Sequence, residues 1–245
     1  MELLNNHVSI RKFKEKRIDE KLLESIIYSG SRASTTGNMQ LYSVIVSRDK
    51  ENIQKLAPFH FNQPLLKSAP VLLTFVADFN RFSRWCTINS AEPGYSNFLS
   101  FITASIDALL FAQNVSVAAE NAGLGICYLG TTTYNAREII ETLHLPKLTF
   151  PITAIALGYP DESPELTDRI PLNGIIHDEE YTDYSKESIK SLYSYKENLA
   201  SSRKFVEENG KLSLAQVFTD IRYKQTDNEY FSEKVLKVLK EQGFM

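Results

Sequence analysis

Residues 98–130 read FLSFITASIDALLFAQNVSVAAENAGLGICYLG. Up to Ala119 only Asp107 is charged, which predicts a buried helix that is apolar on most of its circumference. The serine, threonine and amide side chains in the same stretch are too numerous for a lipid environment. Gly123 ends the predicted helix, and the short apolar run 126–129 predicts a strand directly after it.

Further segments show the periodicity of regular structure. They are predicted helices at 18–29, 135–143 and 229–242, and predicted strands at 41–47, 71–77 and 151–157. Asp19 is the expected N-cap of the first of these helices, and Asn135 is expected to cap the second together with Glu138, as in a capping box. Strands interleaved with helices around one sheet predict an α+β fold of three layers.

The composition changes in the last third of the chain. Residues 175–230 are rich in Tyr, Ser, Lys and Glu and show weak apolar periodicity. Glycine is absent between Gly174 and Gly210, so this segment is not a flexible linker. We therefore expect a first domain over 1–174 and a C-terminal excursion with its terminal helix over 175–245.

The bulk composition excludes several classes of function. The chain has 245 residues, of which 43% are hydrophobic and 23% charged, as in an ordinary globular protein. Its net charge of −3 provides no basic field for nucleic acid. His60, His144 and His177 lack ligand-spaced partners, so no metal site is expected. The N-terminal residues lack the basic and long apolar regions of a signal peptide, which predicts a cytoplasmic protein that does not act in a membrane.

The segment His7-Val8-Ser9-Ile10-Arg11 carries candidate phosphate ligands. In an extended backbone the side chains of His7, Ser9 and Arg11 point to the same side and can converge on one phosphate. Taken alone, the segment is also typical of a solvated turn.

Three other segments carry groups suited to a flat, phosphorylated ligand. In 34–40 (STTGNMQ), hydroxyl side chains precede a Gly-Asn turn, which is also typical of a plain loop before a strand. In 123–130 (GLGICYLG), Gly130 permits a close approach of the backbone to a ring, although a helix C-cap followed by a strand has the same pattern. In 168–171 (DRIP), Arg169 is a candidate phosphate donor or a surface ion-pair residue.

Together, the four segments resemble the flavin-binding elements of the nitroreductase and flavin reductase family, FMN enzymes that use nicotinamide cofactors. The resemblance runs from about residue 4 to residue 180, and 76–81, 123–128 and 157–160 are its most specific stretches. It is nearest to the branch of oxygen-insensitive NADPH nitroreductases and NAD(P)H:FMN oxidoreductases with a long C-terminal excursion. It implies a mostly antiparallel central sheet with long core helices, and an intertwined homodimer with FMN at the subunit boundary.

The resemblance also assigns residues to the flavin site. The implied FMN-binding residues are His7, Ser9, Arg11, Thr35, Gly37, Gln40, Gln63, Tyr128, Gly130, Thr131 and Arg169. Among them, Gln63 matches a glutamine at the pyrimidine edge of the flavin, Arg11 an electrostatic group near the N1–C2 side, and Arg169 a phosphate ligand. The chain departs from the family at Val8 and Thr167, where two cations near the phosphate are usual. No side chain is assigned as a general acid or base.

The function implied by the resemblance is the transfer of a hydride from NADPH or NADH, through FMN, to nitroaromatics, quinones or free flavin. Two alternatives are a dedicated NAD(P)H:flavin reductase and a flavin-binding protein with little turnover, which the loss of two cations permits. An α+β interaction module remains if the four segments match by coincidence. Arg203 and Lys204 lie among acidic residues, which predicts weak discrimination between the two nucleotides.

Overall fold

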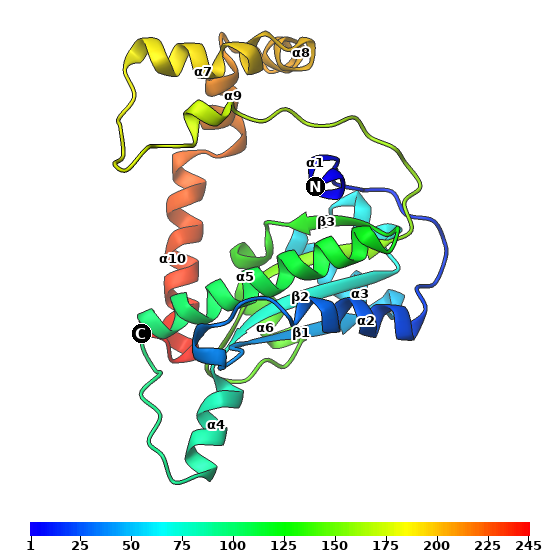
Figure 1. The fold of residues 1–245 in the computed structure, drawn as a ribbon, viewed down its shortest axis with the longest axis vertical. Coiled ribbons are helices and arrows are strands. Elements are labelled where there is room, and N and C mark those ends of the chain that lie inside the picture. The colour runs from blue at the N-terminus through cyan, green and yellow to red at the C-terminus, as the bar shows by residue number, and fades with distance from the viewer. The chain divides into compact units, whose positions relative to one another are not determined.

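The computed structural model describes residues 1–245, which divide into two compact units (Figure 1). The first unit contains residues 1–165 and 233–245, and the second contains residues 166–232. The C-terminal residues therefore belong to the same unit as the N-terminal ones.

The first unit contains a sheet and most of the longer helices. Its strands are β1 (Tyr42–Ser47), β2 (Val71–Asp78), β3 (Gly125–Leu129) and β4 (Thr149–Gly158). Its helices are α1 (Glu2–Asn5), α2 (Glu20–Gly30), α3 (Lys50–Leu56), α4 (Asn80–Ile88), α5 (Phe98–Asn121) and α6 (Ala136–Thr142). The second unit contains α7 (Lys186–Asn198), α8 (Ala200–Glu208), α9 (Leu214–Val217) and a π-helical turn (Phe218–Arg222). The last helix, α10 (Gln225–Gln242), begins in the second unit and ends in the first.

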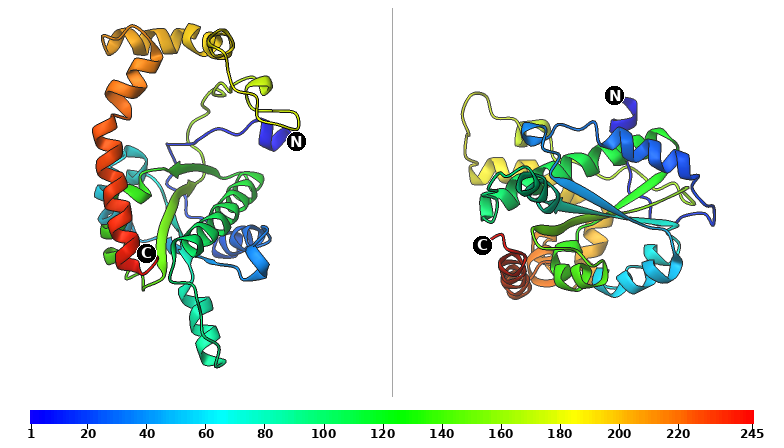
Figure 2. Two further views of the ribbon diagram at one scale, coloured as in Figure 1. Left: turned by 90° about the vertical axis from the view of Figure 1, so that its left-hand side faces the viewer. Right: turned by 90° about the horizontal axis from the view of Figure 1, so that it is seen from below.

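The sheet has the order β1-β2-β4-β3, and every neighbouring pair is antiparallel. Helices cover both of its faces, as Figure 2 shows. Because side chains alternate along a strand, Leu73 and Phe75 of β2 pack with α2 and α5, whereas Leu72 packs with α3 and α6. All of β2 is buried, as the continuous apolar run 71–77 predicts. The expected three-layer α+β fold is confirmed.

Helix α5 is long and apolar enough to cross a membrane by length and composition alone. Its residues Ala108, Phe111 and Val115 are instead buried in the core between α2 and the sheet. The opposite side is not covered within one chain, because Ile106 and Leu109 are 51% and 47% exposed. The predicted core helix is thus buried on one side and leaves an apolar surface on the other.

The C-terminal residues close one end of the first unit. Val238, Leu239 and Phe244 are buried in one cluster with Leu41 and Phe150. This cluster explains why the terminal helix ends where the sequence predicts, with a glycine turn after Gln242.

One of the two expected helix caps is confirmed and the other is wrong. The Asp19 carboxylate accepts a hydrogen bond from Leu22 N at 3.1 Å. Asn135 makes no such cap, because its side-chain oxygen, the atom that a cap requires, accepts from Lys234 Nζ at 3.1 Å, and its amide nitrogen donates to Phe59 O at 2.8 Å. Glu138 lies 3.5 Å from Lys234 Nζ instead of reaching back to Asn135. The tertiary donor Lys234 replaces the local capping partner of Asn135.

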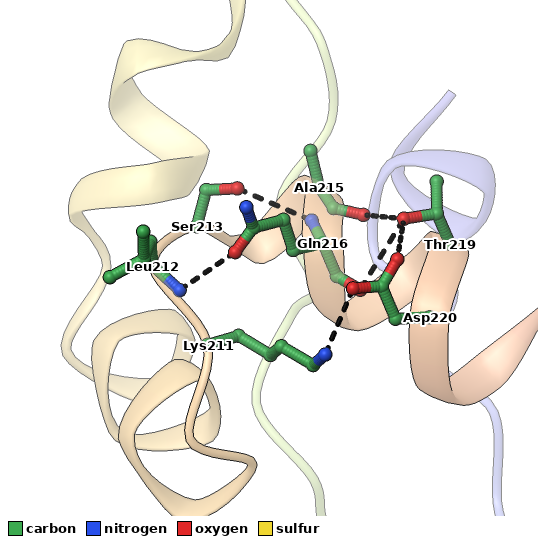
Figure 3. Close-up of polar contacts among 7 residues, drawn as sticks. All are labelled: Lys211, Leu212, Ser213, Ala215, Gln216, Thr219 and Asp220. Atoms are coloured by element: carbon green, nitrogen blue, oxygen red, sulfur yellow. Dashed lines mark hydrogen bonds and ion pairs between the residues drawn. The ribbon is translucent and has the colours of Figure 1, made fainter.

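The second unit is held largely by short-range polar contacts. Figure 3 shows Lys211 Nζ 2.9 Å from the carboxylate of Asp220, which also accepts a hydrogen bond from the Thr219 hydroxyl at 2.7 Å. The side chain of Gln216 accepts from Leu212 N at 2.9 Å. These contacts fix the π-helical turn against the segment that precedes α9.

Candidate functional site

The residues expected to bind a flavin lie at two opposite edges of the sheet. β3 is one edge strand and β1 is the other, with β2 and β4 between them. Three interstrand spacings of about 4.8 Å separate the edges by roughly 14 Å. Residues 7–11, Gln63 and 128–131 lie near β3, whereas the loop 34–40 leads into β1. One chain therefore presents two partial sites.

The N-terminal segment runs along the edge of β3. Ile10 donates its backbone N–H to Ile126 O at 2.9 Å, and its side chain covers Gly125. A Cβ at Gly125 would lie 2.6 Å from Ile10 Cγ1, so a larger residue would push the segment off the strand. Because Ile10 points into the core, its neighbours Ser9 and Arg11 point away from it, as expected from an extended segment.

The side chain of His7 has a close partner within the protein, whereas the side chain of Arg11 is exposed. His7 Nδ1 lies 2.6 Å from the carboxylate of Glu120, which leaves Nε2 for a ligand. The guanidinium of Arg11 is exposed, and it contacts Ser9 O at 3.4 Å. Arg11 is therefore an exposed cation of this edge, and His7 is oriented by a carboxylate on α5.

Gln63 lies beside Thr131, and both contact a buried histidine. Gln63 Nε2 is 3.4 Å from Thr131 Oγ1, and His60 Nδ1 is 3.1 Å from the same oxygen. His60 is 1% exposed. Burial lowers the pKa of His60 to about 4, because the surrounding protein disfavours the charged imidazolium. His60 is thus a neutral hydrogen-bonding residue at neutral pH.

Two sharp turns shape the predicted ligand loops. Phe61 and Asn62, just before Gln63, have φ values of 54° and 52°, in the left-handed region. In the other loop, Gly37 and Asn38 have φ values of 54° and 56°. Left-handed backbone in residues other than glycine is uncommon and concentrates at ligand-binding sites. Such residues also occur away from these loops, at Ser90, His144, Leu148 and Glu179, so the turns define the shape of the loops and do not by themselves indicate a ligand.

The loop 34–40 is fixed by the buried carboxylate of Asp107 on α5. Asp107 Oδ1 accepts hydrogen bonds from Thr36 N at 2.9 Å and Thr36 Oγ1 at 3.0 Å, and Oδ2 accepts from Leu41 N at 3.2 Å. Gln40 donates its side-chain N–H to Asn38 Oδ1 at 3.2 Å. The loop thus has a defined shape, and Thr35 and Gly37 lie on its surface-facing part.

Tyr128 and Gly130 contribute different features to the β3 edge. The Tyr128 hydroxyl lies 3.1 Å from Ser116 Oγ and donates to Gln113 Oε1 at 3.2 Å, so the side chain is turned toward α5. Burial raises the pKa of Tyr128, and the hydrogen bond with Ser116 opposes this rise. At Gly130, no atom lies within 4 Å of the position a Cβ would take. The backbone at Gly130 is therefore open to a ligand.

Arg169 belongs to the second unit. Its guanidinium donates to Thr167 Oγ1 at 2.7 Å and to Asp168 O at 2.9 Å. The Asp168 carboxylate lies 2.9 Å from Lys196 Nζ. These contacts define the local environment of Arg169, and its role as a phosphate ligand stays a prediction.

The chemistry of the β3 edge suits a flavin nucleotide. It offers an exposed guanidinium at Arg11, a hydroxyl at Ser9 and an amide at Gln63, next to open backbone at Gly130. These are donors for a phosphate and for a ring edge on one strand edge.

Sequence reasoning did not identify His60 and Asp107 as part of the site. Each is separated by dozens of residues from the groups that it contacts, so no local motif marks either one. A signal exists for Asp107, because it is the single charge in an apolar helix and such a residue needs internal partners.

Comparison with known proteins gives one family and several close relatives. Residues 4–159 match the model of the nitroreductase family. Among curated proteins, an NADPH-dependent oxidoreductase of Staphylococcus saprophyticus is 33% identical over 211 residues, which cover 82% of each chain.

Solved structures agree over the whole chain. The crystal structure of a protein from Bacteroides fragilis NCTC 9343 is 55% identical, covers 100% of both chains and has a TM-score of 0.99. The structure of an NADPH:FMN oxidoreductase from Vibrio harveyi, solved with NAD⁺, is 27% identical, with a TM-score of 0.79. It covers 99% of this chain and 97% of its own.

Proposed function

The chain belongs to the nitroreductase family, and on that basis we propose that it is an FMN-dependent oxidoreductase that uses NADPH or NADH as its electron donor. The relatives named above, an NADPH-dependent oxidoreductase and an NADPH:FMN oxidoreductase, support this proposal. Bound FMN supplies the redox chemistry, a two-electron transfer from the nucleotide to an acceptor. Nitroaromatics, quinones and free flavin are the acceptor classes that we propose.

The observation that carries the proposal is the donor set along β3. Arg11 is exposed, and we propose that its positive charge lies near the N1–C2 side of the flavin, where it would stabilise the anionic reduced form. Gln63 presents an amide to the ring edge, and Ser9 presents a hydroxyl to the phosphate end. His7, oriented by Glu120, supplies Nε2 to the same phosphate. The protein thus binds and orients the cofactor, and none of these groups needs to act as a general acid.

We propose that the active form is a homodimer. The loop 34–40 carries Thr35, Gly37 and Gln40 at the edge opposite β3, so a second copy is needed to bring this loop to the β3 edge. The exposed apolar side of α5, with Ile106 and Leu109, offers the surface for that contact. A dimer joined by this surface completes the flavin pocket at the subunit boundary, and we place it in the cytoplasm.

The proposal is tested by cofactor identity and turnover. Purified protein is reconstituted with FMN or FAD, and the flavin released by heat is identified by chromatography. We expect FMN, because the donors close on a single phosphate and no glycine-rich turn for a pyrophosphate is present in the sequence. NADPH and NADH oxidation with a panel of nitroaromatics, quinones and free flavin then identifies the acceptor class. Binding of FMN without turnover of any acceptor would support a flavin-binding protein instead.

A further inference from the structure

We propose that His60 is a positioning residue of the flavin pocket, which acts through the Thr131 hydroxyl to fix the side-chain amide of Gln63. This inference rests on the proposed function, because Gln63 is the group expected to meet the pyrimidine edge of FMN. It adds a residue that has no contact of its own with the cofactor.

The first support is that one oxygen joins the two side chains. Thr131 Oγ1 lies 3.1 Å from His60 Nδ1 and 3.4 Å from Gln63 Nε2. His60 is almost completely buried, so its ring cannot exchange this partner for bulk water. The Gln63 contact is longer than an ordinary hydrogen bond of about 2.9 Å, as is common in sites without their ligand.

The second support is that the protons of this hydrogen-bonded chain can be arranged so that every contact has one donor and one acceptor. An amide nitrogen can only donate, so Gln63 Nε2–H donates to Thr131 Oγ1. In the arrangement that we assign, the Thr131 hydroxyl donates its own proton to Nδ1 of His60, which is in the neutral Nε2–H form. The burial of His60 keeps the ring neutral. A hydroxyl can also accept two hydrogen bonds, so the Nδ1–H form is the alternative that the NMR measurement below distinguishes. With its nitrogen committed to Thr131, Gln63 keeps its carbonyl oxygen and its second N–H for a ligand in fixed positions.

The third support is that the backbone around His60 is held rigidly. His60 ends the 3-10 helix Ala57–His60, and Phe61 and Asn62 then turn in the left-handed region. Asn135 donates its side-chain amide to Phe59 O at 2.8 Å, which ties this turn to the 3-10 helix that follows Thr131. A strained turn tied at its base can hold His60 and Gln63 in a fixed relation.

The test compares FMN dissociation constants and midpoint potentials across a small set of variants. His60→Leu and Thr131→Val each remove one member of the hydrogen-bonded series Gln63–Thr131–His60. His60→Asn keeps a hydrogen-bond acceptor near the position of Nδ1. Thr132→Val is the matched control, because the neighbouring hydroxyl donates only to Leu129 O, at 2.8 Å. His60→Leu and Thr131→Val are each expected to weaken FMN binding about fivefold to tenfold. The midpoint potential of bound FMN is expected to shift in the same direction in both variants. His60→Asn and Thr132→Val are expected to stay within about twofold of wild type.

A double-mutant cycle separates positioning from general folding. In a Gln63→Leu background, His60→Leu is expected to change FMN affinity less than about twofold, because the group that it positions is gone. An equal loss in both backgrounds would overturn the inference. If His60→Leu does not fold, His60→Phe, which keeps an aromatic ring but has no ring nitrogen, carries the same cycle.

A final measurement does not involve the cofactor. The ¹⁵N NMR signals of His60 in the flavin-free protein are expected to show the neutral Nε2–H form in wild type and to change in Thr131→Val. The Nδ1–H form in wild type would contradict the inference. A wild-type protein that shows the expected tautomer but binds no flavin would refute the proposed function and leave the hydrogen-bonded chain intact.

Discussion

Asp107 Oδ1 lies 2.9 Å from the backbone nitrogen of Thr36 and joins the middle of α5 to the loop before β1. The same carboxylate also accepts from the Thr36 hydroxyl and from Leu41 N. A buried charge of this kind is stable only with such a set of donors. Asp107 therefore shapes a loop that is expected to contact the flavin, without contacting the flavin itself.

Replacement of Asp107 by Asn is expected to destabilise both the loop and the fold. The amide group of asparagine would face backbone N–H donors with an N–H of its own, and the free energy of unfolding should fall by about 2–3 kcal/mol. Urea denaturation of the two proteins measures this loss. Asp178→Asn, at an exposed position, is the control, and equal stability of the two variants would contradict the role assigned to Asp107.

Arg11→Ala is expected to lower the midpoint potential of bound FMN. Removal of a fixed positive charge disfavours the anionic reduced flavin, and reduction by NAD(P)H should slow about tenfold, more than FMN binding weakens. Arg11→Lys keeps the charge and should retain most of the potential. Spectroelectrochemical titration measures the potential, and an unchanged value in Arg11→Ala would refute the electrostatic role.

Leu109→Glu is expected to separate the dimer and to release FMN in the same step. The side chain lies on the exposed apolar side of α5, where a charge cannot be buried against a second copy. Light scattering and flavin content of the eluted protein are the measurements. Leu212→Glu, at a position that is 92% exposed, should change neither. A Leu109→Glu monomer that retains FMN would show that one chain forms the pocket.

NADPH is expected to be preferred over NADH by less than about tenfold in kcat/KM, or roughly 1.4 kcal/mol. The cations predicted near the nucleotide have local partners, because Arg203 donates to Asn198 Oδ1 at 2.6 Å and Lys204 lies 3.8 Å from Glu208. The preference is measured in wild type and in an Arg203→Ala, Lys204→Ala double variant. A preference of a hundredfold that disappears in the double variant would reveal a 2′-phosphate site.

The stability of the protein is expected to fall below pH 6.5 because of His60. Its pKa is about 4 in the folded protein and 6.5 in the unfolded chain, so the unfolded state takes up a proton first as the pH decreases. As the pH falls from 6.5 to 4, the loss of unfolding free energy approaches about 3 kcal/mol. The loss levels off below pH 4. The difference in unfolding free energy between wild type and His60→Asn, measured from pH 8 to 4, isolates this contribution. A difference that does not vary with pH would contradict it.

The elements with strong local signals were predictable from the sequence. The apolar run 71–77 predicts a strand covered on both faces, and the stretch that begins at Phe98 predicts the long helix. Local patterns failed where the partner is distant in sequence. Asn135 resembles a helix cap, but its side-chain oxygen accepts from the distant Lys234. The helices α3 and α4 have only 7 and 9 residues, too few for a clear periodic pattern.

The same distinction applies to the site. The extended course of the segment before Phe13 was predictable because a buried Ile10 alternates with polar neighbours. The partners of His7 and Thr131 were not, because Glu120 and His60 reach them through the tertiary fold. Sequence patterns identify which groups face a ligand more readily than they identify what holds those groups in place.

The return of the C-terminus to the first unit has a consequence for biosynthesis. Val238, Leu239 and Phe244 cover Leu41 and Phe150, yet they are synthesised long after both of these residues. Although domains generally fold during translation from the N-terminus, this core stays incomplete until Phe244 has been synthesised. Residues 166–232 are then held at both ends by one folded body, which limits the distance over which they can move. A ribosome that stalls in the last turns of α10 would therefore yield a nascent chain with an open hydrophobic core, a substrate for chaperones and proteases.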